Sequence, residues 1–132
     1  MRVLVVDDSA ANRKIARVFL EREGNGVTEA GSGQEALDLL AAQEFDVVLM
    51  DIAMPDMDGL EATRRLRRMG GTAARTPVVA WTAHDIPGMR LQSMAAGVDG
   101  YLTKPIQRTP LVETLQQICN RGGQGGLSIV RA

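Results

Sequence analysis

Three short apolar runs stand out along the chain, at residues 3–6, 46–50 and 77–81. Each run is rich in valine or other aliphatic residues, and none alternates polar with apolar positions. Such runs are typical of strands that are buried on both faces of a parallel sheet. Two weaker candidates, residues 26–30 and 99–102, bring the predicted strands to five.

Amphipathic segments lie between these runs and predict helices. One helix is expected to open near Ser32, because Glu35 follows three residues later in a capping-box pattern. Another is expected over residues 87–96, with Pro87 at its first helical position, and Pro110 is expected inside the first turn of the last helix. The other apolar positions at the spacing of one helix face are Ala11, Ile15, Val18, Phe19, Ala36, Leu37, Leu40, Leu60, Leu66, Met69, Leu111, Leu115, Ile118 and Cys119.

The predicted order is therefore a strand followed by a helix, repeated five times. Alternation of buried strands with amphipathic helices implies an α/β fold, with one parallel sheet covered on both faces and right-handed crossovers. A chain of 132 residues fits a single domain, expected over residues 1–121. Residues 122–132 contain four glycines and are expected to form a flexible tail or the start of a linker.

Two further expectations concern individual side chains. Arg64, Arg65, Arg67 and Arg68 are expected to face water on the third helix, as a solvated surface rather than a nucleic-acid patch. Trp81 is bulky for its place at the end of a strand, so we expect its side chain to point away from the ligand edge of the sheet, toward a helix.

Composition and charge narrow the function classes. The 15 basic and 16 acidic residues give a net charge of −1, so nothing draws the whole chain to nucleic acid or to an anionic membrane. No apolar run approaches the roughly 18 residues that span a bilayer, and the first run is too short for the core of a signal peptide. The single cysteine, Cys119, excludes a disulfide within the chain. These features fit a cytoplasmic protein.

Candidate chemistry follows the predicted strands. In an open parallel sheet, ligands bind beyond the carboxyl ends of the strands. Asp7 and Asp8 follow the first strand, Asp51 the third, Thr82 the fourth and Lys104 the fifth. Three carboxylates, a hydroxyl and an ammonium are thus expected at one edge of the sheet.

Residue types at this edge favour phosphoryl transfer. Three neighbouring carboxylates repel one another, and Mg²⁺, which prefers oxygen ligands, would relieve that repulsion. An ionised Asp51 is a nucleophile that needs no general base, while Mg²⁺ and Lys104 supply the positive charge that phosphoryl transfer requires. Thr82 and the backbone N–H of Ala83 can donate hydrogen bonds to the transferred group. Lys104 is one of only two lysines beside 13 arginines, and its compact ammonium suits phosphate chemistry.

Four motifs give this arrangement a family resemblance. They are VVDD at residues 5–8, MDIAMPDMDG at 50–59, AWTA at 80–83 and YLTKP at 101–105. In this order and at this spacing, the chain resembles the receiver domains of response regulators and of hybrid histidine kinases over about residues 1–120. The resemblance implies a flavodoxin-like, doubly wound, five-stranded parallel sheet and a role in a two-component phosphorelay.

By this resemblance Asp51 is the phospho-acceptor and a ligand of Mg²⁺. Asp8 is a second direct ligand, Asp7 holds a metal-bound water, and the backbone carbonyl of Ala53 is a further ligand. Lys104 pairs with the phosphoryl group. The donor is a phosphohistidine on a histidine kinase or a histidine phosphotransfer protein, and the domain catalyses only its own phosphorylation and dephosphorylation.

The resemblance also implies a switch. Thr82 moves to hydrogen-bond the phosphoryl group, Tyr101 turns inward, and the change reaches a protein partner through the fourth helix, fifth strand and fifth helix, roughly residues 87–119. Phosphorylation adds about 1.5 to 2 negative charges at one point, which is the physical drive for such a change. Ala53, which offers no polar side chain to an attacking water, and His84, the only histidine, are candidates for tuning the lifetime of the phosphate.

Three other functions fit parts of the pattern. A phosphatase of the haloacid-dehalogenase type would carry a second acid two residues after Asp51, where this chain has Ala53. A flavodoxin-like cofactor binder would need a Ser/Thr/Gly-rich phosphate loop in place of Asp7 and Asp8. A receiver that serves only as an interaction module stays open, as do the cognate kinase, the output partner, the oligomeric state, the phosphate lifetime and the choice between a stand-alone regulator and part of a hybrid kinase.

Overall fold

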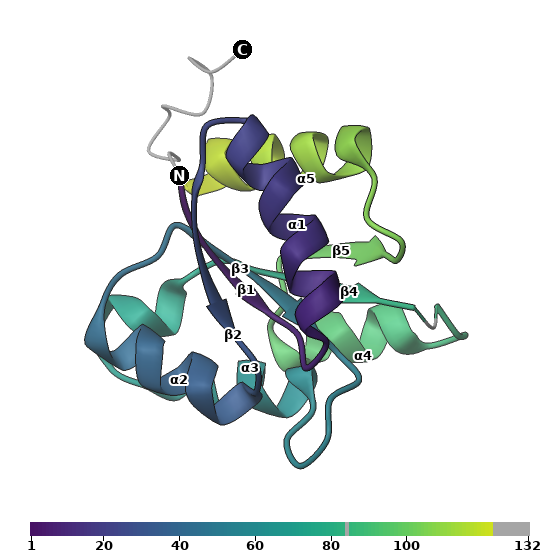
Figure 1. Cartoon of the computed structure of the whole chain (residues 1–132). Coiled ribbons are helices and arrows are strands. Elements are labelled where there is room, and N and C mark those ends of the chain that lie inside the picture. The colour runs from purple at the N-terminus through teal and green to yellow at the C-terminus, as the bar shows by residue number, and fades with distance from the viewer. Residues whose placement is uncertain (84, 123–132) are drawn as a thin grey trace.

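The computed structural model describes residues 1–83 and 85–122, in which strands and helices alternate (Figure 1). The strands are β1 (Arg2–Val6), β2 (Gly26–Ala30), β3 (Val47–Asp51), β4 (Val78–Thr82) and β5 (Gly100–Thr103). The helices are α1 (Ala10–Arg22), α2 (Gly33–Ala42), α3 (Gly59–Arg67), α4 (Met89–Ala96) and α5 (Arg108–Gly122), with a short 3₁₀ helix, η1 (Gly71–Arg75), before β4. The predicted (βα)₅ order is confirmed.

All five strands pair in parallel, in the order β2-β1-β3-β4-β5. Helices α1 and α5 pack on one face of this sheet, and α2, α3 and α4 pack on the other (Figure 1). Strand β1 shows why residues 3–6 are all apolar: Val3 and Val5 point into the core on one face of the sheet, and Leu4 and Val6 into the core on the other. From β1 the chain first adds β2 on one side and then β3, β4 and β5 on the other, so the strand order reverses between β1 and β3. Ligands bind at such a reversal in folds of this kind.

The first turn of α2 agrees with the predicted cap except in one bond. Ser32 Oγ accepts a hydrogen bond from the Glu35 backbone N–H at 3.1 Å. The Glu35 carboxylate, however, accepts from the N–H of Gly31 at 2.7 Å, one residue before the cap. The capping pattern therefore marks the start of the helix correctly, while the return bond falls one residue earlier.

The predicted place of Pro87 is wrong. Helix α4 begins at Met89, and Gly88 precedes it with φ 86° and ψ −13°. The Met89 N–H donates to the carbonyl of Ile86 at 3.1 Å. These values fit a type II turn, which favours proline at its second position and glycine at its third. Pro87 therefore belongs to the turn before the helix.

The prediction for the α3 arginines is wrong at one of the four positions. Arg64, Arg65 and Arg68 are exposed, but the Arg67 side chain is only 24% exposed. Its guanidinium donates to the Gly97 carbonyl and reaches Asp99 at 2.9 Å. Arg67 thus ties α3 to the loop between α4 and β5.

Within the described residues no helix is both long and apolar enough to cross a membrane. Pro110 lies in the first turn of α5, as predicted. Gly122 ends α5, and the rest of the predicted tail lies outside the described residues, as do His84 and the side chain of Cys119.

Candidate functional site

An acidic cluster occupies the carboxyl edge of the sheet, where β1 and β3 end. Asp7 follows β1 and is fully buried, Asp51 ends β3 and is 2% exposed, and Asp8 is exposed. Their carboxylate oxygens lie within 4.8 Å of one another. The structure therefore brings together the three acids that the sequence placed at this edge.

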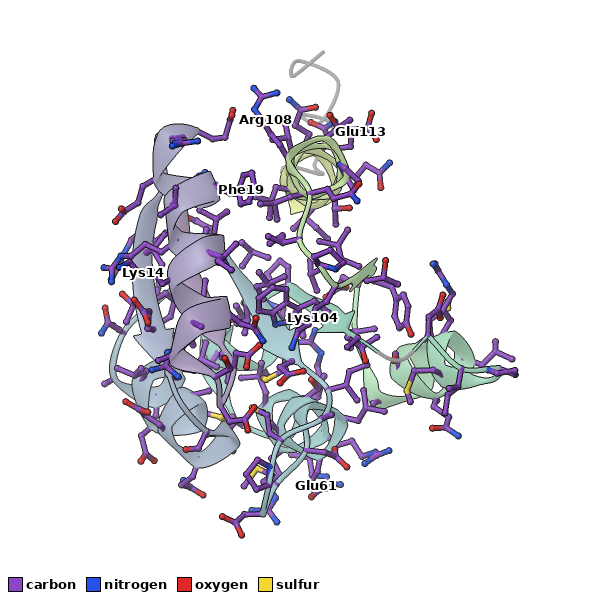
Figure 2. The ribbon with its side chains drawn as sticks, turned by 45° about the vertical axis from the view of Figure 1, so that its right-hand side comes forward. Lys14, Phe19, Glu61, Lys104, Arg108 and Glu113 are labelled. Carbon is purple, nitrogen blue, oxygen red and sulfur yellow. The ribbon has the colours of Figure 1, made fainter. Side chains whose placement is uncertain are left out.

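Lys104 joins this cluster from the end of β5. Its Nζ atom lies 2.8 Å from Asp7 Oδ2 and 3.1 Å from Asp51 Oδ1, and its side chain is 15% exposed. Figure 2 shows Lys104 near the centre of the molecule, between α1 and α4. One ammonium thus bridges two buried carboxylates that come from different strands.

Local hydrogen bonds hold Asp7 at the start of α1. Its Oδ1 accepts from the backbone N–H of Ser9 at 2.8 Å, and Ser9 is the N-cap of α1. Its backbone carbonyl accepts from the Arg13 guanidinium at 2.6 Å. The turn into α1 therefore orients Asp7 inward and leaves Asp8 toward solvent.

Gly59 allows the loop after Asp51 to close. Its backbone N–H donates to the Ile52 carbonyl at 2.9 Å. A Cβ atom at this position would lie 2.1 Å from the Asp51 carbonyl oxygen, a distance that no side chain can occupy. In the sequence, Gly59 was only the last residue of the 50–59 motif. The close approach of two backbone segments explains why this position requires glycine.

Burial and charge change the acid–base behaviour of the site. Burial and the neighbouring Asp7 charge raise the pKa of Asp51 to about 6, although Lys104 opposes that rise. Burial alone would lower the pKa of Lys104, but its contacts with Asp7 and Asp51 outweigh burial and raise that pKa. The cluster thus sets three carboxyl groups against one ammonium, with Asp7 and Asp51 poorly solvated.

These donor atoms fit Mg²⁺. The cluster presents hard carboxylate oxygens, two of its three acids are buried, and the described neighbours add only the single charge of Lys104 within salt-bridge distance. A divalent cation would neutralise the remaining negative charge, and Mg²⁺ needs only a few protein oxygens because it keeps several waters.

The predicted hydrogen-bond donors lie at the end of β4. Thr82 is buried, pairs in register with Thr103 of β5, and is followed by the exposed Ala83. Ala53, two residues after Asp51, is also exposed, and its N–H donates to Asp51 Oδ1 at 3.3 Å. His84, the other candidate for tuning, lies outside the described residues.

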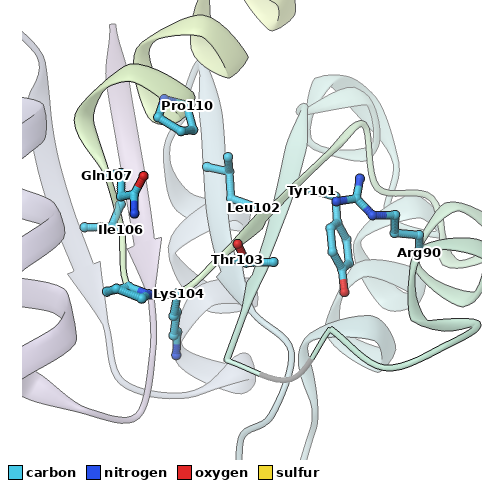
Figure 3. Close-up of a pocket in the computed structure, with 9 residues that line it drawn as sticks. Arg90, Tyr101, Leu102, Thr103, Lys104, Ile106, Gln107 and Pro110 are labelled. Carbon is cyan, nitrogen blue, oxygen red and sulfur yellow. The ribbon is translucent and has the colours of Figure 1, made fainter.

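Tyr101 lies beside the site and is held by two charged residues. Its hydroxyl donates to Asp85 at 3.0 Å, and the Arg90 guanidinium carbon lies 4.5 Å from the centre of its ring. A pocket of about 250 Å³ separates Tyr101 and Arg90 from Lys104 and from Pro110 of α5 (Figure 3). In this structure Tyr101 therefore contacts α4 and the loop before it.

Trp81 departs in part from its prediction. Its ring is 2% exposed and packs in the core shared with α1 and α5, as expected. The same ring, however, lies 4.7 Å from Lys104 Nζ, measured to its centre. Trp81 therefore also contacts the site, because an indole is wide enough to reach from the core to Lys104 at the edge of the sheet.

Comparison with known proteins gives one consistent result. A family model described as the response regulator receiver domain matches residues 3–116. The transcriptional regulatory protein ResD of Bacillus subtilis is 34% identical over 93% of this chain and 50% of its own length. Hybrid signal transduction histidine kinase I of Dictyostelium discoideum is 37% identical over 89% of this chain and 7% of its own length. The chain thus spans half or less of these curated relatives.

Solved structures agree in fold. Chemotaxis protein CheY4 of Vibrio cholerae matches with a TM-score of 0.82 and 33% identity, covering 89% of this chain and 97% of its own. The receiver domain of sensor histidine kinase PA1611 of Pseudomonas aeruginosa matches with a TM-score of 0.81 and 34% identity, covering 88% and 94%. That second structure is described as having a magnesium ion coordinated in its active-site cleft.

Proposed function

The chain belongs to the response regulator receiver family, and from that premise we propose that it accepts a phosphoryl group from a phosphohistidine onto Asp51, with Mg²⁺. The observation that carries the proposal is the contact of Lys104 Nζ with both Asp7 and Asp51, inside a cluster of three carboxylates. A buried nucleophile, a metal-binding acid pair and a cation for the phosphoryl oxygens are then within one site.

In the transfer step an Asp51 carboxylate oxygen attacks phosphorus. The new bond joins that oxygen to phosphorus, the phosphorus–nitrogen bond breaks, and the imidazole leaves with the electron pair and takes up a proton. Lys104 pairs with one phosphoryl oxygen, while the Thr82 hydroxyl and the Ala83 N–H donate to the others. Because phosphoryl transfer is mostly a matter of positioning and charge neutralisation, these donors suffice without a general base.

Mg²⁺ would be held by Asp8, by Asp51 and by the backbone carbonyl of Ala53, with Asp7 bonded to a metal-bound water. When bound it neutralises charge on the carboxylates and on the transferring group. The same residues serve hydrolysis of the product: a water oxygen attacks phosphorus and gives up its proton, the bond between phosphorus and the Asp51 oxygen breaks, and the Asp51 carboxylate is restored with release of inorganic phosphate. The domain acts on its own aspartyl phosphate rather than on external substrates, and Ala53 and His84 tune how long it lasts.

The output of the reaction is a change at the surface formed by α4, β5 and α5. Thr82 moves toward the phosphoryl group, and Tyr101 leaves Asp85 and Arg90 to follow it. This motion would reshape the pocket between Arg90 and Pro110 (Figure 3). A protein partner reads the new surface; neither nucleic acid nor a membrane is contacted directly.

The donor is a histidine kinase or a histidine phosphotransfer protein in the cytoplasm. The relatives support a phosphohistidine donor, since the chain matches response regulators and, over a small part of their length, hybrid or probable histidine kinases. Residues 1–121 form the receiver. A receiver that is never phosphorylated and only binds partners is the alternative, and the experiment below separates the two.

The test is intact mass after incubation with Mg²⁺ and acetyl phosphate or phosphoramidate. The wild type is expected to gain one phosphoryl group, which Asp51→Asn and EDTA abolish. Asp56→Asn is the matched control, because Asp56 is an exposed acid in the same loop and its loss should leave the gain intact. If neither small donors nor a phosphohistidine protein phosphorylates the wild type, the proposal is wrong and the interaction module is favoured.

A further inference from the structure

Lys104 has a third partner that bears no charge. Its Nζ atom lies over the Trp81 ring, 4.7 Å from the ring centre, and also contacts Asp7 and Asp51. An ammonium over the face of an indole is attracted by the ring quadrupole, and tryptophan is the strongest of the aromatic partners. The three contacts together define where the ammonium lies.

The two carboxylate contacts depend on what else is bound. Asp7 and Asp51 both belong to the cluster that fits Mg²⁺, so a bound cation competes with Lys104 for the same oxygens and repels its positive charge. The contact with Trp81 uses no oxygen that a cation could claim. The contact with Trp81 should therefore persist when a cation neutralises the acidic cluster.

Trp81 is itself firmly placed. It is 2% exposed, and in the sheet it pairs in register with Asp51 on one side and Leu102 on the other. Its indole Nε1 lies 3.5 Å from the carbonyl oxygen of Val6, a weak hydrogen bond at the end of β1. Packing and the strand pairing thus hold the ring beside the strand that carries Asp51. Because these contacts involve no charged group, the position of the ring should not change when a cation binds.

We propose that Trp81 is a positioning residue, which keeps the Lys104 ammonium on the Asp51 side of the site when Mg²⁺ occupies the acidic cluster. The inference rests on the proposed function, because it gives Lys104 its place before the phosphoryl group arrives. Without the ring, the flexible lysine side chain would have to be ordered during the reaction itself, which slows the reaction.

The first experiment observes Lys104 directly and needs no activity. The chain has two lysines, and Lys14 is exposed on α1 (Figure 2), so protein labelled with ¹³C at the lysine ε carbon provides an internal control. The Lys104 ε protons are expected upfield of those of Lys14 because they lie over the ring face. The shift should persist when Mg²⁺ is added and vanish in Trp81→Leu. Loss of the shift on adding Mg²⁺ would overturn the proposal.

The second experiment separates the aromatic face from packing. Trp81→Phe and Trp81→Leu both remove the indole N–H and leave a cavity, but only phenylalanine keeps a ring under Lys104. Trp81→Leu is expected to be phosphorylated about 3- to 10-fold more slowly than Trp81→Phe, the factor that a loss of one cation–π contact corresponds to. Val79→Ala, buried in the same cluster and on the same strand, controls for loss of core packing.

The outcomes distinguish this inference from the function on which it rests. Equal rates for the two Trp81 variants, with a phosphorylated wild type, would overturn the positioning role and leave the phospho-acceptor intact. A wild type that no donor phosphorylates would overturn the function and the reaction role of Trp81 together, even with the Lys104 shift present. Slower reaction of Trp81→Leu alone, together with a shift that survives Mg²⁺, is the result expected.

Discussion

The two edges of the sheet each hold a cluster of charges, and the clusters differ in how well those charges are satisfied. At the amino ends of β4 and β5, the Arg67 guanidinium makes five hydrogen bonds, to the carbonyls of Gly97, Ala74 and Thr76 and to Asp99. At the carboxyl edge three carboxylates gather, and among the described residues Lys104 is the one cation within salt-bridge distance of Asp7 and Asp51.

The two clusters also differ in whether their charges are balanced. Arg67 joins three segments with donors and acceptors in balance, so its cluster stabilises the fold. The acidic cluster buries charge that its neighbours do not neutralise, and burial raises the pKa of Asp51 to about 6. The comparison indicates that the first cluster serves stability, while the second stores electrostatic strain that a bound cation can relieve.

Removing Arg67 should have the largest effect on stability. Arg67→Met would remove the donor that three carbonyls share and the cation beside Asp99, which keeps its hydrogen bond from the Val78 N–H. We therefore expect the free energy of unfolding to fall by about 2–4 kcal/mol. Urea denaturation measures this, with exposed Arg68→Met as the matched control at about 0.5 kcal/mol or less. Equal effects for both variants would show that the Arg67 cluster adds no stability of its own.

Adding Mg²⁺ should stabilise the fold through the opposite edge. A ligand that binds only the folded chain adds about 2.7 kcal/mol at a concentration 100 times its dissociation constant. We expect this gain in the free energy of unfolding for the wild type and for Asp56→Asn, and a clearly smaller gain for Asp8→Asn. Urea denaturation at a series of Mg²⁺ concentrations measures it. A gain that is the same in Asp8→Asn would place the cation elsewhere.

Neutralising Asp51 should also stabilise the metal-free fold. The folded-state pKa of about 6 exceeds the reference value of 3.8, so the folded chain binds the proton more tightly than the unfolded chain. Stability is therefore lost as pH rises from about 4 through 6 and stays lower above that range.

At pH 7 in EDTA, Asp51→Asn is accordingly expected to be more stable than the wild type by about 1–3 kcal/mol. The advantage should shrink as the pH falls from about 6 toward 4, the range between the folded and reference pKa values of Asp51. Unfolding curves at several pH values test both points. A variant that is less stable than the wild type at neutral pH would mean that Asp51 is not strained.

The smallest effect is expected from a surface pair that belongs to neither cluster. Arg65 lies 2.9 Å from Glu61 one turn away on α3, and both side chains are substantially exposed. Since exposed ion pairs are screened by water and salt, Arg65→Gln should shift the urea midpoint less than any change above. A loss comparable to that of Arg67→Met would break the distinction between saturated and exposed arginines.

The acidic site could be predicted because its residues occupy equivalent places in the sequence. Asp7, Asp51 and Lys104 each end or follow a strand, and parallel strands bring those ends to one edge. The role of Arg67 could not be predicted this way. Its carboxylate partner, Asp99, lies 32 residues further along the chain, and no local pattern relates the two.

The position of Pro87 and the contact of Trp81 with Lys104 were missed for other reasons. Proline suits both a helix start and a type II turn, and the positive φ of Gly88 decides between them. The burial of Trp81 followed from its strand, but contact between its ring and Lys104 depends on how far an indole extends over the neighbouring strands.

The sequence by itself determined the order of strands and helices and the acids that gather at one edge of the sheet, because periodicity and strand ends are local properties. The tertiary structure alone decided which charges are satisfied. It surrounded Arg67 with acceptors from distant segments, closed Gly59 against the Asp51 backbone, and set Lys104 between two carboxylates and an indole. The satisfaction of a charge depends on every group within a few ångströms, and packing brings those groups together from across the chain.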